Sequence, residues 1–257
     1  MFRKGLNPFL LFFLNMKKIL YFFLIFATTV QSQKNDGIAI YKMILSDKKD
    51  FSDFKSGELK DRLENMQNEV EKMHPKLKFN KQKAVFYLDG LINDAAEMAG
   101  NLYCQCYNGK YIDLQTQKTY QSSEAGIVSE NGEYTIERPI LNNWKITTET
   151  KLISEYKCIK ATQTVYTSDA LKQEVIAWFC PDLNIPFGPN GYAGLPGLII
   201  ELQQAGVVFG LESLKFSKKQ IDIKIPTKGK TISFDDYYRL TKKKIAELKI
   251  DQINQTK

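Results

Sequence analysis

Residues 178–202 read WFCPDLNIPFGPNGYAGLPGLIIEL and hold four of the chain's eight prolines and four of its 15 glycines. The segment opens and closes on apolar residues typical of strands. Proline removes backbone donors and glycine permits positive φ, so the middle of the segment cannot form a regular β-ladder. Its large apolar side chains exclude a solvated linker. The sequence therefore predicts an ordered apolar loop or strand crossover packed against a sheet.

On both sides of this segment, short β-prone runs are separated by turns. The pairs Asn108-Gly109 and Asn131-Gly132 are strong hairpin signals. Strands and helices do not alternate regularly, which favours an antiparallel meander over a parallel sheet. The expected strands are residues 37–45, 83–88, 102–107, 111–114, 127–129, 134–137, 144–150, 153–161, 175–179, 198–202, 207–214 and 221–225.

One amphipathic helix is predicted between Asp53 and Met73, ended by Pro75. Its apolar residues recur at spacings of three and four, which places them on one stripe that needs a partner surface. They are Leu59, Leu63, Met66, Val70 and Met73. The expected fold is thus β-rich α+β, with a curved, mostly antiparallel sheet (open-barrel or meander-like) and this helix packed on it.

The ends of the chain differ from its body. The segment from Met16, MKKILYFFLIFATTVQSQ, has a basic start and an apolar run of 12 residues, too short to span a bilayer and typical of a signal peptide. We expect translation from Met16, removal of residues 1–32, and release into the periplasm or the medium without a lipid anchor. Residues 33–232 form the expected domain. Residues 233–257 form a basic tail, helical from Ser233 or partly disordered.

The net charge of +7 is a sum over these parts. Four lysines and arginines belong to residues 1–32, residues 33–217 carry 21 basic and 24 acidic groups, and residues 218–257 carry 11 and 5. Because the body is mildly acidic, we expect no nucleic-acid partner. Solvated tail lysines are favoured over contact with a membrane or an acidic partner.

The sequence Gly194, Leu195, Pro196, Gly197, Leu198 and Ile199 spells GLPGLI. Trp178, Asp182, Pro186, Gly188 and Pro189 precede it in the order seen in the GLPGLI family, which residues 140–202 resemble. The resemblance implies a secreted, largely β protein of the Bacteroidota envelope, from a family without an established function. Genes of that family often lie near those for TonB-dependent outer-membrane transporters. The resemblance supplies no catalytic residues, and Cys180 stands where the family commonly has Thr.

Four cysteines in an exported chain suggest disulfides. If residues 153–161 and 175–179 pair around a loop centred near Asp169, Cys158 lies opposite Cys180, and we expect these two to bond. Cys104 and Cys106 lie two apart in an expected strand, where a bond between them would strain the backbone. Four free buried thiols are the alternative. No metal is expected, because C-x-C is not the usual zinc spacing.

The single histidine, His74, and the lack of a nucleophile elbow or Walker loop argue against an enzyme. Asp182 and Glu201 flank GLPGLI and are the residues a carboxylate-dependent hydrolase would use, although a turn Asp and a solvent-facing strand Glu are favoured. We expect a non-catalytic protein without a cofactor. It would bind a small apolar ligand or an outer-membrane, transporter-linked partner, with a structural role in outer-membrane assembly as a further alternative. A deep apolar cavity would favour the ligand, and a filled core with an exposed apolar patch the partner.

Overall fold

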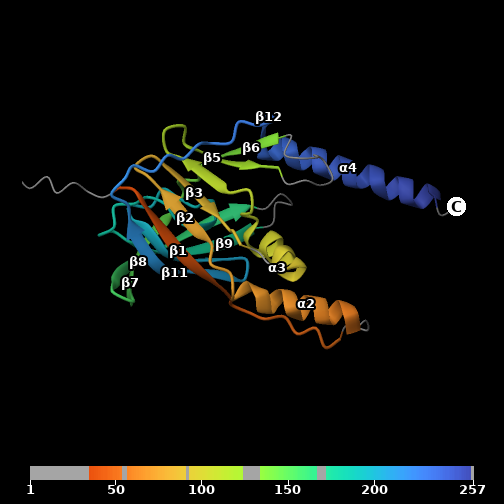
Figure 1. Cartoon of the computed structure of the whole chain (residues 1–257), viewed down its shortest axis with the longest axis horizontal. Coiled ribbons are helices and arrows are strands. Elements are labelled where there is room, and N and C mark those ends of the chain that lie inside the picture. The colour runs from red at the N-terminus through yellow and green to blue at the C-terminus, as the bar shows by residue number, and fades with distance from the viewer. Residues whose placement is uncertain (1–34, 54–56, 91–92, 124–133, 167–171, 256–257) are drawn as a thin grey trace, which may run out of the picture. The chain divides into compact units, whose positions relative to one another are not determined.

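The sheet consists of two antiparallel meanders that meet where β1 pairs with β11 (Figure 1). The computed structural model describes residues 35–53, 57–90, 93–123, 134–166 and 172–255. The first meander is β1 (Gly37–Leu45), β2 (Lys76–Phe79), β3 (Lys83–Tyr87), β4 (Lys110–Asp113), β5 (Lys118–Ser122) and β6 (Tyr134–Pro139). The second is β7 (Lys145–Ile153), β8 (Tyr156–Tyr166), β9 (Lys172–Cys180), β10 (Leu198–Gln204) and β11 (Val207–Phe216). Because β12 (Lys230–Ser233) pairs with β6 in parallel, the sheet is mixed.

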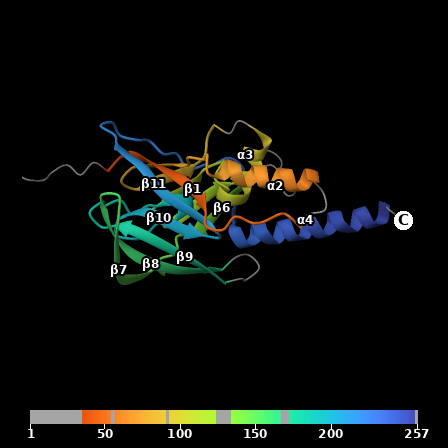
Figure 2. The same cartoon turned by 90° about the horizontal axis from the view of Figure 1, so that it is seen from below.

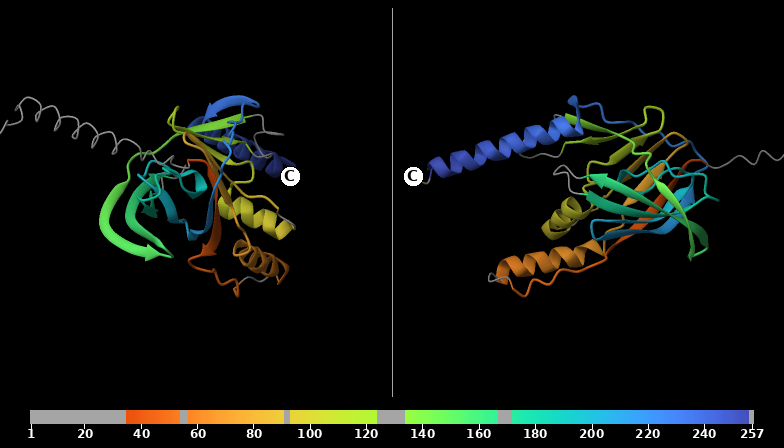
Figure 3. Two further views of the ribbon diagram at one scale, coloured as in Figure 1. Left: turned by 60° about the vertical axis from the view of Figure 1, so that its left-hand side comes forward. Right: turned by 180° about the vertical axis from the view of Figure 1, so that it is seen from behind.

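A short connection shows that the sheet is curled. In the order β12-β6-β5-β4-β3-β2-β1-β11-β10-β9-β8-β7, strands β6 and β7 are ten positions apart, yet only residues 140–144 join them. In a flat sheet they would be separated by roughly 48 Å, since neighbouring strands lie about 4.8 Å apart. The connection can span at most about 21 Å. The two sides therefore bend toward each other, as the curved strands in Figure 3 show, and the expected β-rich α+β fold with a curved, mostly antiparallel sheet is confirmed.

The core lies on the concave face of this sheet. Alternate residues of β1 are buried, among them Tyr41 and Met43, neither of which is exposed to solvent. The ring of Phe86 contacts those of Tyr41 and Phe209 edge-on, with centroids 6.1 and 5.8 Å apart. These rings join the two meanders across the β1–β11 pair.

The predicted amphipathic helix is present as α2 (Gly57–Val70). Met66, Val70 and the following Met73 are buried, whereas Leu59 is 44% exposed. The helix packs mainly against α3 (Asp94–Ala99) and touches the sheet only at β1, so it does not cross a sheet face (Figure 2). The sequence reading did not find α3, although Asn93 caps it through a 2.8 Å bond from the backbone N–H of Ala96 to its Oδ1.

Two expected strands are wrong. Residues 102–107 instead contain the end of a π-helix, η1 (Gly100–Cys104), followed by Gln105 in the left-handed conformation. Residues 221–225 are irregular. Short strands β2, β5 and β12 were not predicted, and residues 127–129 lie outside the described residues. Strand β1 has the predicted bounds.

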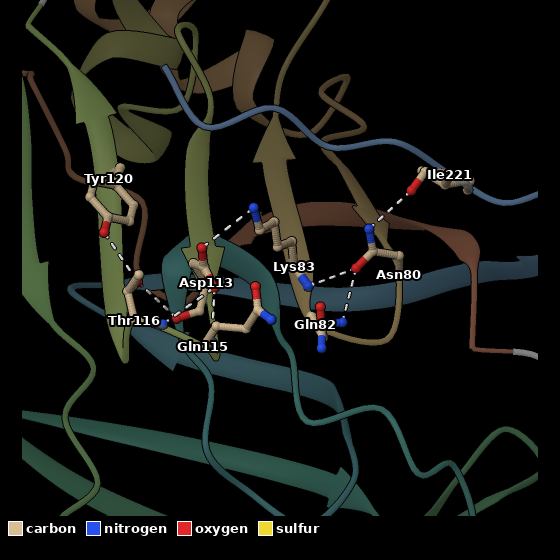
Figure 4. A network of polar contacts seen from close by, with 8 residues as sticks. All are labelled: Asn80, Gln82, Lys83, Asp113, Gln115, Thr116, Tyr120 and Ile221. Carbon is tan, nitrogen blue, oxygen red and sulfur yellow. Dashed lines mark hydrogen bonds and ion pairs between the residues drawn. The ribbon is translucent and has the colours of Figure 1, made fainter. Parts of the chain in front are cut away.

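The irregular stretch at residues 221–225 is held by side chains from neighbouring turns (Figure 4). Asn80 donates from Nδ2 to the Ile221 carbonyl at 2.9 Å, and the Ile221 N–H donates to Asp36 Oδ2 at 2.6 Å. The Asn80 Oδ1 also accepts the backbone N–H groups of Gln82 and Lys83 at 2.9 and 2.8 Å. The amide of Asn80 therefore fixes the β2–β3 turn and the passing chain together.

The tail forms helix α4 (Phe234–Gln255), which leads away from the sheet in Figure 1. Ser233 Oγ caps it by accepting the Asp236 N–H at 3.1 Å. The Arg138 guanidinium stacks 3.1 Å from the Phe234 ring centroid and anchors the first turn to β6. In the part of the chain that the structure describes, no helix has the length and apolar character needed to cross a bilayer. The predicted signal peptide lies outside the described residues.

Candidate functional site

The Pro/Gly segment runs from β9 to β10 as an ordered loop, residues 181–197, as the sequence predicts. It folds back on itself through a bridge between Phe187 and Ala193, around a short 3₁₀ turn, η2 (Pro189–Gly191). The Leu198 N–H donates to the Leu183 carbonyl at 3.0 Å, and the Gly194 N–H donates to the Pro186 carbonyl at 3.2 Å. These bonds replace the ladder that proline and glycine prevent.

The loop fills the concave side of the sheet. The side chains of Phe187 and Leu195 are 1% exposed, and that of Ile199, where β10 begins, is not exposed at all. Tyr41 Oη donates to the Ile199 carbonyl at 2.7 Å, joining β1 to the end of the motif. The apolar residues of the GLPGLI segment are therefore part of the core, and they occupy the space that an internal ligand would need.

Polar side chains bind the loop to distant strands. Lys110 Nζ of β4 donates to Asn190 Oδ1 at 2.6 Å, and Asn190 Nδ2 donates to Gln204 Oε1 of β10 at 2.8 Å. From the β6–β7 connection, Trp144 Nε1 donates to the Ala193 carbonyl at 2.9 Å. Both meanders thus hold the loop, and the Asn190-Gly191 turn is fixed between Lys110 of β4 and Gln204 of β10.

Two motif glycines are required by close backbone or side-chain approach. A Cβ at Gly197 would lie 2.2 Å from the Cys180 carbonyl oxygen, and one at Gly188 would lie 2.4 Å from Ile199 Cδ1. Pro186 and Pro189 are half-buried and buried within the loop, and Pro196 lies exposed next to Gly197. The motif residues consequently act in packing.

Trp178 and Glu201 lie opposite each other on β9 and β10, on the sheet face that is opposite to the face of Phe179 and Ile199. Lys151 Nζ is 2.9 Å from Glu201 Oε1 and 4.4 Å from the centroid of the Trp178 ring. Gln203 Nε2 donates to the same carboxylate oxygen at 2.8 Å. Asp182 is exposed in the turn after β9, and no contact of the described residues joins it to Glu201.

The expected bond between Cys158 and Cys180 is wrong: both cysteines are free and buried. The predicted register is confirmed, since Ile159 pairs with Phe179 and places Cys158 opposite Cys180. In a regular antiparallel pair, opposite Cβ atoms lie about 4.5–5.5 Å apart, more than the roughly 3.8 Å typical of a disulfide. Burial, with Cys180 nearby, raises the pKa of the Cys158 thiol to about 12.

Cys104 and Cys106 are bonded to each other instead. The left-handed Gln105 between them turns the chain sharply and brings their Cα atoms to 5.1 Å, which an extended strand would not. This bond was not expected, because Cys104 and Cys106 would point to one face of an extended strand without this turn. The signal that could have been used is Gly100, which opens a helical turn directly before Cys104.

His74 pairs with Glu212 through a 2.7 Å contact between Nδ1 and Oε2, and both side chains are about half exposed. Among the described residues, no group of three or more His, Cys, Asp or Glu side chains is arranged to hold a metal ion. Asp113 is 4% exposed, but it accepts the Gln115 N–H at 2.8 Å and lies 3.5 Å from Lys83 Nζ, so it stabilises a turn (Figure 4).

A polar groove of about 610 Å³ lies between α2 and α3. One wall is formed by Asn65, Asn68 and Glu69 of α2 and by Lys72 just after it, and the other wall by Asn93, which caps α3, and by the first residues of α3. These α2 positions follow the three- and four-residue spacing of one helix face. The sequence reading missed this groove because it followed only the apolar stripe of the helix.

Comparison with known proteins adds a family segment and a fold. A family model described as a protein of unknown function (Porph_ging) matches residues 167–201, which include most of the Pro/Gly segment. No curated protein matches this chain. Two solved structures of PNGF-II, in P21 and C2 space groups, are similar in fold, with TM-scores of 0.52 and 0.51 and sequence identities of 15% and 16%. The similarity covers 82% and 81% of this chain but only 34% and 33% of those chains, so this chain spans about a third of their length.

Proposed function

We propose that this chain is an exported, non-catalytic protein of the GLPGLI type that acts by binding a protein partner in the bacterial envelope. The observation that carries the proposal is the filled concave face. Phe187, Leu195 and Ile199 occupy it, so recognition has to take place on the outside of the sheet. The Porph_ging match over residues 167–201 supports the family assignment, because it includes all six residues of GLPGLI.

The exposed apolar side chains indicate where the partner would bind. Leu152 is 72% exposed, Tyr166 70%, Ile146 52% and Leu141 46%. Ile146 and Leu152 lie on one face of the β7–β8 hairpin, whereas the register places Tyr166 on the other face, so we call Ile146 and Leu152 the hairpin apolar surface. Single exposed apolar residues are ordinary, but several on one element mark an interaction site.

The free edge of β7 favours contact through side chains over addition of a strand. The β7–β8 ladder is interrupted between Ile146 and Thr150, and β7 begins with the exposed Lys145. Bulges and edge lysines are the devices by which proteins block pairing at a sheet edge. A partner would therefore bury Ile146 and Leu152 without extending the sheet.

The test is site-specific photo-crosslinking in cells that produce the protein. A photoreactive amino acid at Leu152 is expected to capture one defined envelope protein, whereas the same group at Lys224, whose side chain is 87% exposed outside the hairpin, is expected to capture none. Leu152→Asp in the unlabelled chain should weaken co-purification of that protein at least about tenfold, the loss of one buried leucine contact. Recovery of a bound lipid with no crosslink at Leu152 would contradict the proposal.

A further inference from the structure

The groove between α2 and α3 has chemistry that neither the hairpin apolar surface nor the motif loop uses. The side-chain amides of Asn65 and Asn68 make no hydrogen bond to a described residue, although each carries two donor hydrogens and one acceptor oxygen. Both are exposed on consecutive turns of α2 and border the same hollow. Unused amides in a concave surface are available to a ligand.

The remaining polar groups are held in defined orientations. Asn93 Oδ1 accepts the Ala96 N–H at 2.8 Å, which leaves the Asn93 NH₂ group as a donor. Glu69 Oε1 pairs with Lys72 Nζ at 2.8 Å, and the Glu69 side chain is only 16% exposed while that of Lys72 is 67% exposed. The carboxylate thus lies low in the groove with its second oxygen available as an acceptor, and the ammonium lies at the rim.

Charge and polarity restrict the ligand class. Glu69 is neutralised by Lys72, and Asp94 leaves the lining with one net negative charge, so an anion is disfavoured. Six of the seven lining residues carry an amide or a charge, which disfavours a wholly apolar ligand. Hydroxyl groups both donate and accept, and they match a mixture of amide donors, amide acceptors and a carboxylate acceptor.

We propose that the α2–α3 groove binds a neutral saccharide, with Asn65, Asn68 and Asn93 and the Glu69 carboxylate as its hydrogen-bonding groups. A volume of about 610 Å³ is large enough for one or two sugar rings, and the groove is wide open to solvent. The site is separate from the hairpin apolar surface, so its failure would leave the proposed partner binding untouched, and the reverse also holds.

The test is ligand-observed NMR on the full chain with cellobiose, chitobiose, maltose and mannobiose, each at millimolar concentration, and with putrescine and inorganic phosphate as charged probes. At least one disaccharide is expected to bind, and its affinity should fall at least about tenfold in the double variant Asn65→Ala/Asn68→Ala, which removes two amides worth about 1 kcal/mol each. Alanine is a strong helix former at these exposed positions, so the double variant should unfold at the same temperature or higher.

The matched control is Lys60→Ala on another face of α2, which removes only an exposed pairing with Glu64 and should leave binding unchanged. The proposal is overturned if none of the four disaccharides binds, if only putrescine or phosphate binds, or if binding persists in a folded double variant. An effect of Lys60→Ala as large as that of the double variant would also overturn it, because the groove would then not be the site.

Discussion

The packing of the Pro/Gly loop against β9 can be tested at Gly197, where an added Cβ would come closer to another strand than at any other glycine of the loop. In Gly197→Ala, the added Cβ would lie 2.2 Å from the Cys180 carbonyl oxygen and 2.7 Å from its carbonyl carbon. Carbon atoms in contact prefer about 3.5–4.0 Å, so the first pair of the β9–β10 ladder, Leu198 and Cys180, would have to open by roughly 1 Å. Both clashing atoms are backbone, and no side-chain rotation can relieve the clash.

We expect Gly197→Ala to lower the free energy of unfolding by roughly 2–4 kcal/mol, the upper end of the overpacking range. For a domain of this size, that corresponds to a fall in melting temperature of about 5–15 °C. The assay is urea unfolding followed by tryptophan fluorescence. It reports on this region directly, because the chain's two tryptophans, Trp144 and Trp178, lie beside the loop.

The matched control is Gly57→Ala. Gly57 begins α2, and a Cβ there would meet no heavy atom within 4 Å. Alanine should leave the stability unchanged or raise it by up to about 1 kcal/mol. If Gly197→Ala unfolds at the same urea concentration as the wild type, the backbone of the loop is not held against Cys180 and the packing role of GLPGLI is refuted.

Three further results are expected. Under non-reducing conditions at pH 8, iodoacetamide should modify no cysteine in the native protein and two cysteines after unfolding. The reason is that Cys158 and Cys180 are buried, and burial raises the pKa of the Cys158 thiol to about 12. If no cysteine is modified after unfolding, these two cysteines are bonded. Burial also raises the pKa of Tyr41 well above its usual value, so the tyrosine loses its proton at lower pH in the unfolded chain than in the folded one. Tyr41 alone should therefore lower the free energy of unfolding by about 1.4 kcal/mol per pH unit above pH 10. Tyr41→Phe should be less stable at pH 7, because it lacks the bond to the Ile199 carbonyl, but its stability should fall less steeply at high pH; an equally steep fall would rule out Tyr41 as the cause. Trp144→Phe removes the donor to the Ala193 carbonyl and should cost about 1–3 kcal/mol in urea unfolding, whereas a cost near zero would mean that the connection does not hold the loop.

The sequence predicted the elements whose periodicity is strong and local. Strand β1 alternates buried and partly exposed positions along its whole length, and α2 carries a stripe that continues to Met73. The register that places Cys158 opposite Cys180 followed from the symmetry of the β8–β9 hairpin alone. In each case the pattern and the tertiary packing favour the same conformation.

The misses arise where local and tertiary preferences differ. Residues 102–107 look like a strand before Asn108-Gly109, but a π-helical turn and the Cys104–Cys106 bond decide their conformation. Residues 221–225 alternate like a strand, yet the groups that bind Ile221 come from Asn80 and Asp36, more than a hundred residues away in the chain. Strands β2 and β12, four residues each, are too short to show a period.

The sequence predicted which residues form the ordered Pro/Gly loop, but not that the loop fills the concave face of the sheet. The Pro/Gly segment was expected to be an ordered loop against the sheet, and it is. That it fills the concave face depends on the curl of the sheet, which follows from the order of strands and the short β6–β7 connection. Neither the order of the strands nor the distance that the β6–β7 connection must span can be read from a local sequence pattern.

The central position of β1 has a consequence for how the chain can fold. Its β2 partner follows within about 40 residues, but Gly37 pairs on the other side with Phe216, near the end of the sheet sequence. A chain that emerges N-terminus first therefore carries a nine-residue strand with one unsatisfied edge until β11 has been delivered. Long-range pairing of this kind slows folding and exposes apolar edges to aggregation. We expect a chain cut before Val207 to aggregate, because the second meander then has no strand with which to close against β1.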